Sequence, residues 1–468
     1  MHVCSFGIHR RFVVHGLLLC LCARPAQADA VDDYIKGELR KRHIPGLSLA
    51  VWHDGKVVKS AAYGLANLEL HVAAGPDTVF QIQSITKTFT SAAILLLAEE
   101  GKLSLDDPVG KHLEGVPEAW NGITIRHLLT HTSGLKDFIN EPTASLRLDV
   151  TEEEVLKAAA PRPLNFTPGE NWGYSNTNYH LLAMIIRRLT GKSYGDFLNE
   201  RVFTPLEMSA TRIYSHSAII AARASGYHWR GETFINGDFV AEPILGYGGG
   251  GILSTAPDMA RWAGALLSGK LLTPATVEQA WTAAKRKDGT SCFYGLGWGV
   301  GSADGHREIG HGGGHMTGFS SYLALYPDDR LAVVVLTNAS NINTGRIARC
   351  VAGFHVPALA PTPAKAIEDK EPEVTALLRE CIERAPAWKL QQEKFGPELW
   401  KVLLQQRLAV QAMTAMLGPV TAVELLTRSE EGGLRSYRYR VKFTNGTYII
   451  FISLSGEGKI VGLNADEE

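Results

Sequence analysis

Short apolar runs separated by turn residues lie near both ends of the first 350 residues. Residues 46–52 form one apolar run, Asp54-Gly55 is a two-residue turn signal, and residues 56–63 form a second run. This is the pattern of a β-hairpin. Further runs that predict strands follow much later, over residues 295–301, 319–326 and 331–336. We therefore expect both ends of this region to contribute to one sheet.

Between these runs the pattern is mostly helical. A helix is expected from about Ser84, because the residues up to Leu97 are apolar on nearly every side at helical spacing. A helix that is apolar all round is buried. Residues 181–189 and 259–267 carry further helical patterns. The predicted fold class is α/β: an antiparallel sheet flanked by helices, with an inserted helical subdomain.

The last hundred residues predict a separate module. Prolines spaced with Ala and Thr over residues 357–367 indicate a linker. Helical patterns follow at 374–384 and 397–417, and residues 437–443 alternate strictly between apolar and polar. Asn445-Gly446 is a strong hairpin signal before a partner strand. We predict a small α+β C-terminal domain over residues 368–468.

The N-terminus has the features of a signal peptide. A basic start at Arg10-Arg11 precedes a short apolar stretch, and Ala26-Gln27-Ala28 is a small-x-small cleavage pattern. The alternative is an uncleaved anchor, for which the stretch is too short to span a bilayer comfortably. We therefore predict a signal peptide over residues 1–28, a main domain over 29–356, and export to the periplasm or the exterior.

Composition and charge exclude few functions but argue against two. The chain has 468 residues, 45% of them hydrophobic, and a formal net charge of -1. Such a balance gives no electrostatic reason to expect a nucleic acid or an anionic membrane surface as a partner. Nothing in the sequence indicates the oligomeric state.

Cysteines and histidines do not predict a disulfide framework, a metal site or a cofactor. Three of the six cysteines lie in the leader, and an odd, widely spaced trio remains. One disulfide among that trio stays open, although ordinary thiols are the favoured interpretation. His127 and His131 are four residues apart, but no Glu lies between them and no third ligand is suggested, so structural roles are favoured. The cysteines of the trio are Cys292, Cys350 and Cys381.

A serine and a lysine three residues apart open the predicted buried helix. Positions i and i+3 share a helix face, so the Ser84 hydroxyl and the Lys87 ammonium can meet. A serine hydroxyl is a weak nucleophile until a base takes its proton, and a lysine whose charge is disfavoured by burial can do so. The tetrapeptide alone is common by chance, but its place before an apolar helix predicts a partly buried Lys87.

Two later segments carry further candidate chemistry. Tyr174-Ser175-Asn176 offers a phenol that can transfer a proton and an amide that can contact a substrate. The segment His311-Gly312-Gly313-Gly314 lies between strand patterns, and its glycines would let backbone approach a ligand closely. A strand edge there could donate an N–H group to an oxyanion. Taken singly, each segment is also compatible with an ordinary turn.

Together, these three segments resemble the serine β-lactamase and penicillin-binding-protein family, whose signature is S-x-x-K, a second polar motif and K-T-G. The Y-x-N motif is similar to that of class C β-lactamases and D-alanyl-D-alanine carboxypeptidases, and H-x-G is similar to the variant in related esterases and D-amino-acid peptidases. The resemblance covers about residues 31–350. It extends to the segments 101–109, 123–135, 250–255 and 336–338.

The resemblance implies a role for each matching residue. Ser84 would be the acylated nucleophile, Lys87 its activating partner, and Tyr174 the general base and acid. The substrate would contact Asn176, His311 and Gly313, and the backbone N–H groups of Ser84 and Gly314 would form the oxyanion hole. Two positions depart from the family pattern: Gln83 stands where a small residue is expected, and Glu207 replaces the usual Gly.

The third motif bears on the substrate. A Lys there is a fixed cation that suits a carboxylate, whereas His311 is mostly neutral at neutral pH. We therefore expect a serine hydrolase that acts through an acyl-enzyme and is esterase-like. The alternatives are a D-amino-acid peptidase or D-alanyl-D-alanine carboxypeptidase, a weak β-lactamase, or a catalytically idle protein that binds peptide or lipid. Peptidoglycan-like fragments belong to the same range of substrates.

Overall fold

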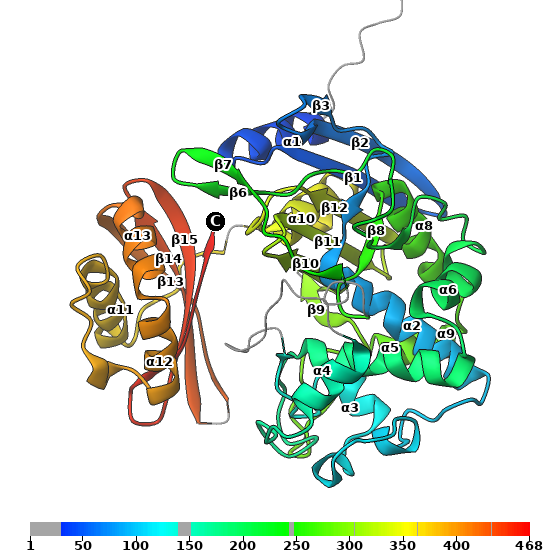
Figure 1. Cartoon of the computed structure of the whole chain (residues 1–468). Helices are drawn as coiled ribbons and strands as arrows, with labels where there is room; N and C mark the ends of the chain where they lie inside the picture. The colour runs from blue at the N-terminus through cyan, green and yellow to red at the C-terminus, as the bar shows by residue number, and fades with distance from the viewer. Residues whose placement is uncertain (1–29, 139–150, 243–247, 304, 363, 432) are drawn as a thin grey trace, which may run out of the picture. The chain divides into compact units, whose positions relative to one another are not determined.

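The computed structural model describes residues 30–138, 151–242, 248–303, 305–362, 364–431 and 433–468 (Figure 1). The predicted signal peptide lies outside the described residues. The chain divides into two compact units, and each is treated by itself. The first ends at Gly301 and resumes over Glu308–Pro357, and the second comprises Ser302–Arg307 and Ala358–Glu468.

The first unit is built on a seven-stranded sheet in the order β3-β2-β1-β12-β11-β10-β9. The N-terminal hairpin pairs with the last strands of the unit: β1 runs antiparallel to β12, from Leu47 opposite Thr337 to His53 opposite Leu331. The predicted sharing of one sheet by distant segments is therefore correct. The strands are β1 Gly46–His53, β2 Lys56–Asn67, β3 Val72–Ala73, β9 Gly299–Ala303, β10 His306–His315, β11 Phe319–Tyr326 and β12 Leu331–Thr337.

Helices cover this sheet and form the inserted region between its two halves. Every residue of β12 is buried, which is the burial expected of a strand covered on both faces. Helix α8 packs on β1 and β12, and α10 packs on β11 and β12. The helices are α1 Ala30–Lys41, α2 Thr86–Glu99, α3 Ile125–Leu129, α4 Glu152–Ala159, α5 Asn176–Thr190, α6 Tyr194–Leu198, α8 Ala256–Leu267, α9 Pro274–Ala280 and α10 Thr344–His355.

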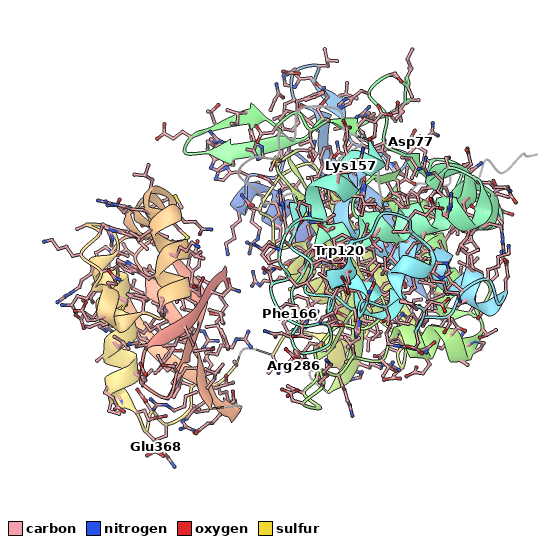
Figure 2. The ribbon with its side chains drawn as sticks, turned by 60° about the horizontal axis from the view of Figure 1, so that its bottom comes forward. Asp77, Trp120, Lys157, Phe166, Arg286 and Glu368 are labelled. Atoms are coloured by element: carbon pink, nitrogen blue, oxygen red, sulfur yellow. The ribbon has the colours of Figure 1, made fainter. Side chains whose placement is uncertain are left out.

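Two small sheets complete the first unit. Strand β8 pairs with β4 along one edge and with β5 along the other. The turn that carries Ser84 follows β4 closely in the sequence. Figure 2 shows how densely side chains fill the unit; Trp120, which it labels, is only 1% exposed. The short strands are β4 Phe80–Gln81, β5 Arg212–Ile213, β6 Tyr227–Arg230, β7 Thr233–Asn236 and β8 Ile252–Ser254.

Helix α2 confirms the expectation of a buried helix. Its residues from Thr86 to Leu97 are all buried, including Lys87. The α-helix begins two residues later than predicted, because Gln83–Ile85 form a 3-10 turn before it. Ser84 therefore lies in that turn, while Lys87 lies in the first turn of the α-helix.

The second unit is a four-stranded antiparallel sheet with three helices on one face (Figure 1). The predicted alternation is borne out, since Tyr437, Tyr439, Val441 and Phe443 are buried. Strand β13 was not predicted, and the helix expected over 397–417 is two helices that meet at Gln406. The elements are α11 Pro372–Arg384, α12 Pro397–Gln405, α13 Arg407–Leu417, β13 Val420–Glu431, β14 Leu434–Phe443, β15 Gly446–Leu454 and β16 Ile460–Glu467.

The mixed α/β fold class, with antiparallel sheets flanked by helices, is thus confirmed. Cys292, Cys350 and Cys381 are free thiols. Among the helices of the described residues, none combines the length and the apolar character needed to cross a lipid bilayer.

Candidate active site

The Ser84 turn brings the first two predicted residues together. The Lys87 Nζ lies 3.2 Å from the Ser84 Oγ, within hydrogen-bond distance. The 3-10 turn does not disturb this contact, because Ser84 still precedes Lys87 by one helical turn. The predicted meeting of hydroxyl and ammonium is therefore present in the structure.

Strands β10 and β11 hold the Ser84 turn against the sheet. The Ser321 hydroxyl of β11 donates a hydrogen bond of 2.7 Å to the Ile82 carbonyl. Opposite Ser321 in β10 lies Gly313, where a Cβ would stand 2.4 Å from that carbonyl oxygen and 2.8 Å from the Gln83 Cβ. Only glycine fits such a contact without a shift of backbone. The H-x-G segment is therefore part of a strand, and Gly313 allows that strand to lie against the serine turn.

Lys87 is fully buried and has three acceptors. Besides Ser84, its Nζ donates to the Asn176 Oδ1 at 2.8 Å and to the Gly249 carbonyl at 2.6 Å. Burial lowers the pKa of Lys87 to about 7, against a smaller upward effect of the Asp137 carboxylate. A substantial fraction of Lys87 is thus neutral near pH 7 and able to accept a proton.

Tyr174 completes the contact around Ser84. Its hydroxyl is hydrogen-bonded to Ser84, and its ring centroid lies 4.8 Å from the Lys87 Nζ. The residue as a whole is 37% exposed, but its phenol group lies among protein atoms, and burial raises its pKa despite the Ser84 hydrogen bond. Tyr174 is therefore a neutral phenol at neutral pH, whereas Lys87 titrates there.

His131, predicted to be structural, supports the Y-x-N segment. Its Nδ1 accepts from the Ser175 backbone N–H at 3.2 Å and from the Asn178 Nδ2 at 3.1 Å, so the ring proton is assigned to Nε2. The ring packs on that of Tyr174, with centroids 4.4 Å apart. Burial holds the pKa of His131 well below its usual range, and the ring is neutral.

His127 lies apart from this arrangement. Its Nδ1 accepts from the Thr124 backbone N–H at 3.2 Å, within a capping box at the start of α3. Among the described residues, no three His, Cys, Asp or Glu side chains are grouped as ligands of a metal ion would be.

His311 has a partner that the sequence did not reveal. Its Nδ1 contacts the Gly312 carbonyl at 2.7 Å and therefore carries the proton, so its Nε2 accepts from the Tyr294 hydroxyl at 2.8 Å. Burial, with the nearby charge of Lys87, lowers the pKa of His311 to about 3. The third motif therefore supplies no positive charge at neutral pH.

Asp137 is a second residue that sequence reasoning missed. Its Oδ2 accepts from the Asn176 Nδ2 at 2.9 Å, so the Asn176 amide links the carboxylate to Lys87. Asp137 lies two residues after the segment 123–135, and this closeness to a family-like segment is the one signal that could have pointed to it.

Gly314 differs from Gly313 in what it contacts. A Cβ at Gly314 would meet nothing nearer than the Phe319 carbonyl oxygen, at 4.0 Å. Packing therefore does not require glycine at this position. A role for the Gly314 N–H in an oxyanion hole stays a proposal.

This fold and this arrangement of Ser84, Lys87, Tyr174 and Asn176 define the class of β-lactamase-like and penicillin-binding-protein-like proteins. The sequence model of the family described as Beta-lactamase matches residues 31–349. The chain belongs to the Beta-lactamase family, and the resemblance inferred from the motifs is confirmed.

Individual relatives agree with this assignment. Protein flp of Staphylococcus aureus is 31% identical over 320 residues, which are 66% of this chain and 63% of flp. The D-stereospecific amidohydrolase from Streptomyces sp. is 28% identical, with a TM-score of 0.57 over 66% of this chain and 93% of that one. The octameric penicillin-binding protein homologue from Pyrococcus abyssi is 23% identical and shares the fold, with a TM-score of 0.62 over 94% of this chain and 98% of its own.

Proposed function

We propose that this chain is a serine hydrolase that cleaves esters through an acyl-enzyme on Ser84. The observation that carries the proposal is the fully buried Lys87, 3.2 Å from the Ser84 Oγ, with a pKa of about 7. A base poised near the working pH is efficient, because a large fraction is deprotonated while it still binds the transferred proton.

Acylation begins as the Ser84 Oγ attacks the substrate carbonyl carbon and its proton moves to the neutral Nζ of Lys87. The carbonyl oxygen takes up negative charge, which the backbone N–H groups of Ser84 and Gly314 would stabilise. When this intermediate collapses, the bond to the leaving group breaks and the leaving group takes a proton. The Tyr174 hydroxyl can deliver that proton while it receives one from the Lys87 ammonium.

Deacylation repeats the same transfers with water. A water molecule attacks the acyl carbon and gives its proton to Lys87, the bond to the Ser84 Oγ breaks, and the acid is released as the Oγ regains a proton. The Asn176 amide, fixed between Lys87 and Asp137, lies beside these transfers and can contact the acyl part of the substrate.

The preference for esters rests on His311. Because its pKa is lowered to about 3, His311 is neutral and offers a substrate carboxylate no fixed charge. Neutral acyl groups should therefore be accepted without an anionic group on the substrate. Efficient hydrolysis of β-lactams, whose recognition uses such a group, is not expected.

A second candidate is hydrolysis of D-amino-acid amides or peptides. Asp137 supports it, because a carboxylate beside Asn176 would favour a substrate that carries an ammonium group. The 28% identical amidohydrolase is named as D-stereospecific, which agrees with this candidate. A catalytically idle binding protein is the third candidate, and the contact between Ser84 and Lys87 argues against it.

The test is a hydrolysis panel on the purified protein: a short-chain nitrophenyl ester, a D-amino-acid amide, a D-alanyl peptide and a chromogenic cephalosporin. Ser84→Ala is the variant, and Ser217→Ala, at an exposed serine, is its matched control. We expect the ester to be the best substrate and Ser84→Ala alone to abolish turnover. A preference for the amide, the peptide or the cephalosporin would refute the esterase proposal but not the acyl-enzyme. Absence of turnover, with no acyl adduct on Ser84 by mass spectrometry, would favour the binding protein.

A further inference from the structure

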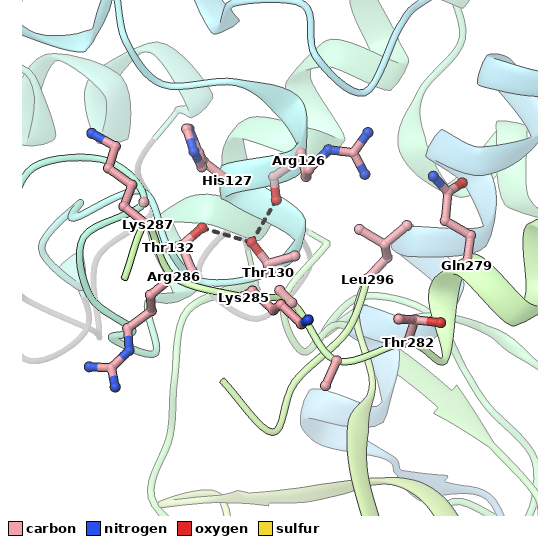
Figure 3. A pocket seen from close by; sticks show the side chains of 13 residues that line it. Arg126, His127, Thr130, Thr132, Gln279, Thr282, Lys285, Arg286, Lys287 and Leu296 are labelled. Carbon is pink, nitrogen blue, oxygen red and sulfur yellow. Dashed lines mark hydrogen bonds between the residues drawn. The ribbon is translucent and has the colours of Figure 1, made fainter. Parts of the chain in front are cut away.

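A basic pocket lies on the first unit outside the Ser84 site. Its volume is about 390 Å³, and residues 126–132 face residues 279–287 across it (Figure 3). Four basic side chains line it: Arg126, Lys285, Arg286 and Lys287.

The charges in this pocket are not balanced. Arg126 is paired with Asp106 through contacts of 2.8 and 3.1 Å, and Arg286 lies 3.8 Å from Asp288. Lys285 and Lys287, in contrast, form no ion pair with any described residue. None of the described residues that line the pocket is acidic. The formal net charge of the chain is only -1, so this excess of positive charge is local.

Main-chain contacts hold the pocket in shape. The Lys287 N–H donates to the Gly169 carbonyl at 2.9 Å, and the Gly169 N–H donates to the Thr132 carbonyl at 2.8 Å. At the base, the Thr130 hydroxyl donates to the Arg126 carbonyl and lies 2.8 Å from the Thr132 hydroxyl (Figure 3). The two basic segments are therefore fixed facing each other before any ligand binds, as in most small-molecule sites.

We propose that this pocket binds a small anion with two or more closely spaced negative oxygens, of the diphosphate or polycarboxylate type. The two lysines without ion pairs supply the attraction, and Arg286 adds a third basic side chain. A single negative charge would leave most of this repulsion among cations uncompensated, so a multiply charged anion is favoured. The volume suits a ligand of this size.

Titration calorimetry with pyrophosphate and with citrate tests the proposal on the purified full chain. The variant is Lys285→Ala/Lys287→Ala, and the control is Lys56→Ala/Lys270→Ala, which removes two exposed lysines elsewhere on the same unit. Because an exposed charge contact contributes modestly, we expect the pocket variant to bind about tenfold more weakly than the control. The unfolding temperature without ligand should be the same for both variants, which shows that each is folded.

Equal affinity of the two double variants would overturn the proposal, because the attraction would then be nonspecific. Binding of neither pyrophosphate nor citrate would overturn it as well. If pyrophosphate binds and citrate does not, the ligand is a phosphoryl compound, and the reverse result identifies a polycarboxylate. Affinity for either should fall as the salt concentration rises.

Discussion

In the proposed mechanism, the charge of Asp137 should help to set the pH at which ester hydrolysis becomes efficient. Asp137→Asn keeps an acceptor for the Asn176 amide but removes the negative charge that favours the protonated form of Lys87. The pKa of Lys87 should therefore fall below about 7. Because the proposed mechanism needs the neutral amine of Lys87, the rise of the hydrolysis rate with pH should move to lower pH.

The size of this effect follows from the hydrogen-bonded chain. Lys87 Nζ to Asn176 Oδ1 is 2.8 Å, and Asn176 Nδ2 to Asp137 Oδ2 is 2.9 Å. With about 2.3 Å across the amide, the charges are at most about 8 Å apart. Two unit charges at about 8 Å interact by about 0.5 to 2 kcal/mol for effective dielectric constants of about 80 to 20, which is about 0.4 to 1.5 pH units.

The assay is kcat/KM for a short-chain ester between about pH 5 and 9, a range that brackets both protonation states. Wild-type activity should rise through about pH 7, since Lys87 must lose its proton first. Asp328→Asn removes the same charge from the turn between β11 and β12, and its profile should match the wild type. The reasoning is refuted if the midpoint of Asp137→Asn coincides with that of Asp328→Asn or moves upward.

Three further changes have definite expected outcomes. Glu207→Gly should raise the free energy of unfolding by about 0.5–1 kcal/mol, since Glu207 has a φ of 57°; a loss of stability in chemical denaturation would contradict this. Tyr294→Phe leaves the buried His311 Nε2 without its donor and should destabilise by about 1–3 kcal/mol, with a fall in kcat/KM; unchanged stability and kinetics would show that the bond is unimportant. Gly313→Ala places a Cβ 2.4 Å from the Ile82 carbonyl and should destabilise by about 1–3 kcal/mol and lower kcat, whereas Gly301→Ala, at a glycine with open space, should do neither.

The sequence was most informative where the relevant contacts are local. Ser84 and Lys87 meet because one helical turn separates them, and the helix after them is buried because it is apolar on all sides. The alternation of apolar and polar residues over 437–443 also predicted a strand correctly, because one face of β14 is buried and the other is more exposed. In these cases the spacing of residues along the chain is enough to predict which side chains meet or share a face.

The sequence was least informative where contacting residues lie far apart along the chain, and where glycines replace the apolar residues that would mark a strand. Tyr294 reaches His311 across 17 residues and Asp137 reaches Asn176 across 39, and neither spacing has a periodic signature. The run of glycines at 312–314 lacks the apolar alternation of a strand, although these residues lie within β10. Within this run only Gly313 has no room for a Cβ, because the Ile82 carbonyl oxygen and the Ser321 hydroxyl lie too close, and that requirement appears only in three dimensions.

Gln83 shows how a departure from the family pattern can be compensated. A small residue is expected there, and Gln83 has a φ of 52°, a conformation that costs any residue with a Cβ some strain. The buried Gln83 Nε2 donates to the Gln81 Oε1 and to the Thr317 Oγ1, each at 2.8 Å, and the Thr317 hydroxyl donates to the same Gln81 oxygen. This three-membered network can offset a backbone strain of about 1–3 kcal/mol. Since Gln83 precedes Ser84 directly, this hydrogen bond connects the serine turn to Thr317, 234 positions further along the chain, and so helps to fix the position of Ser84.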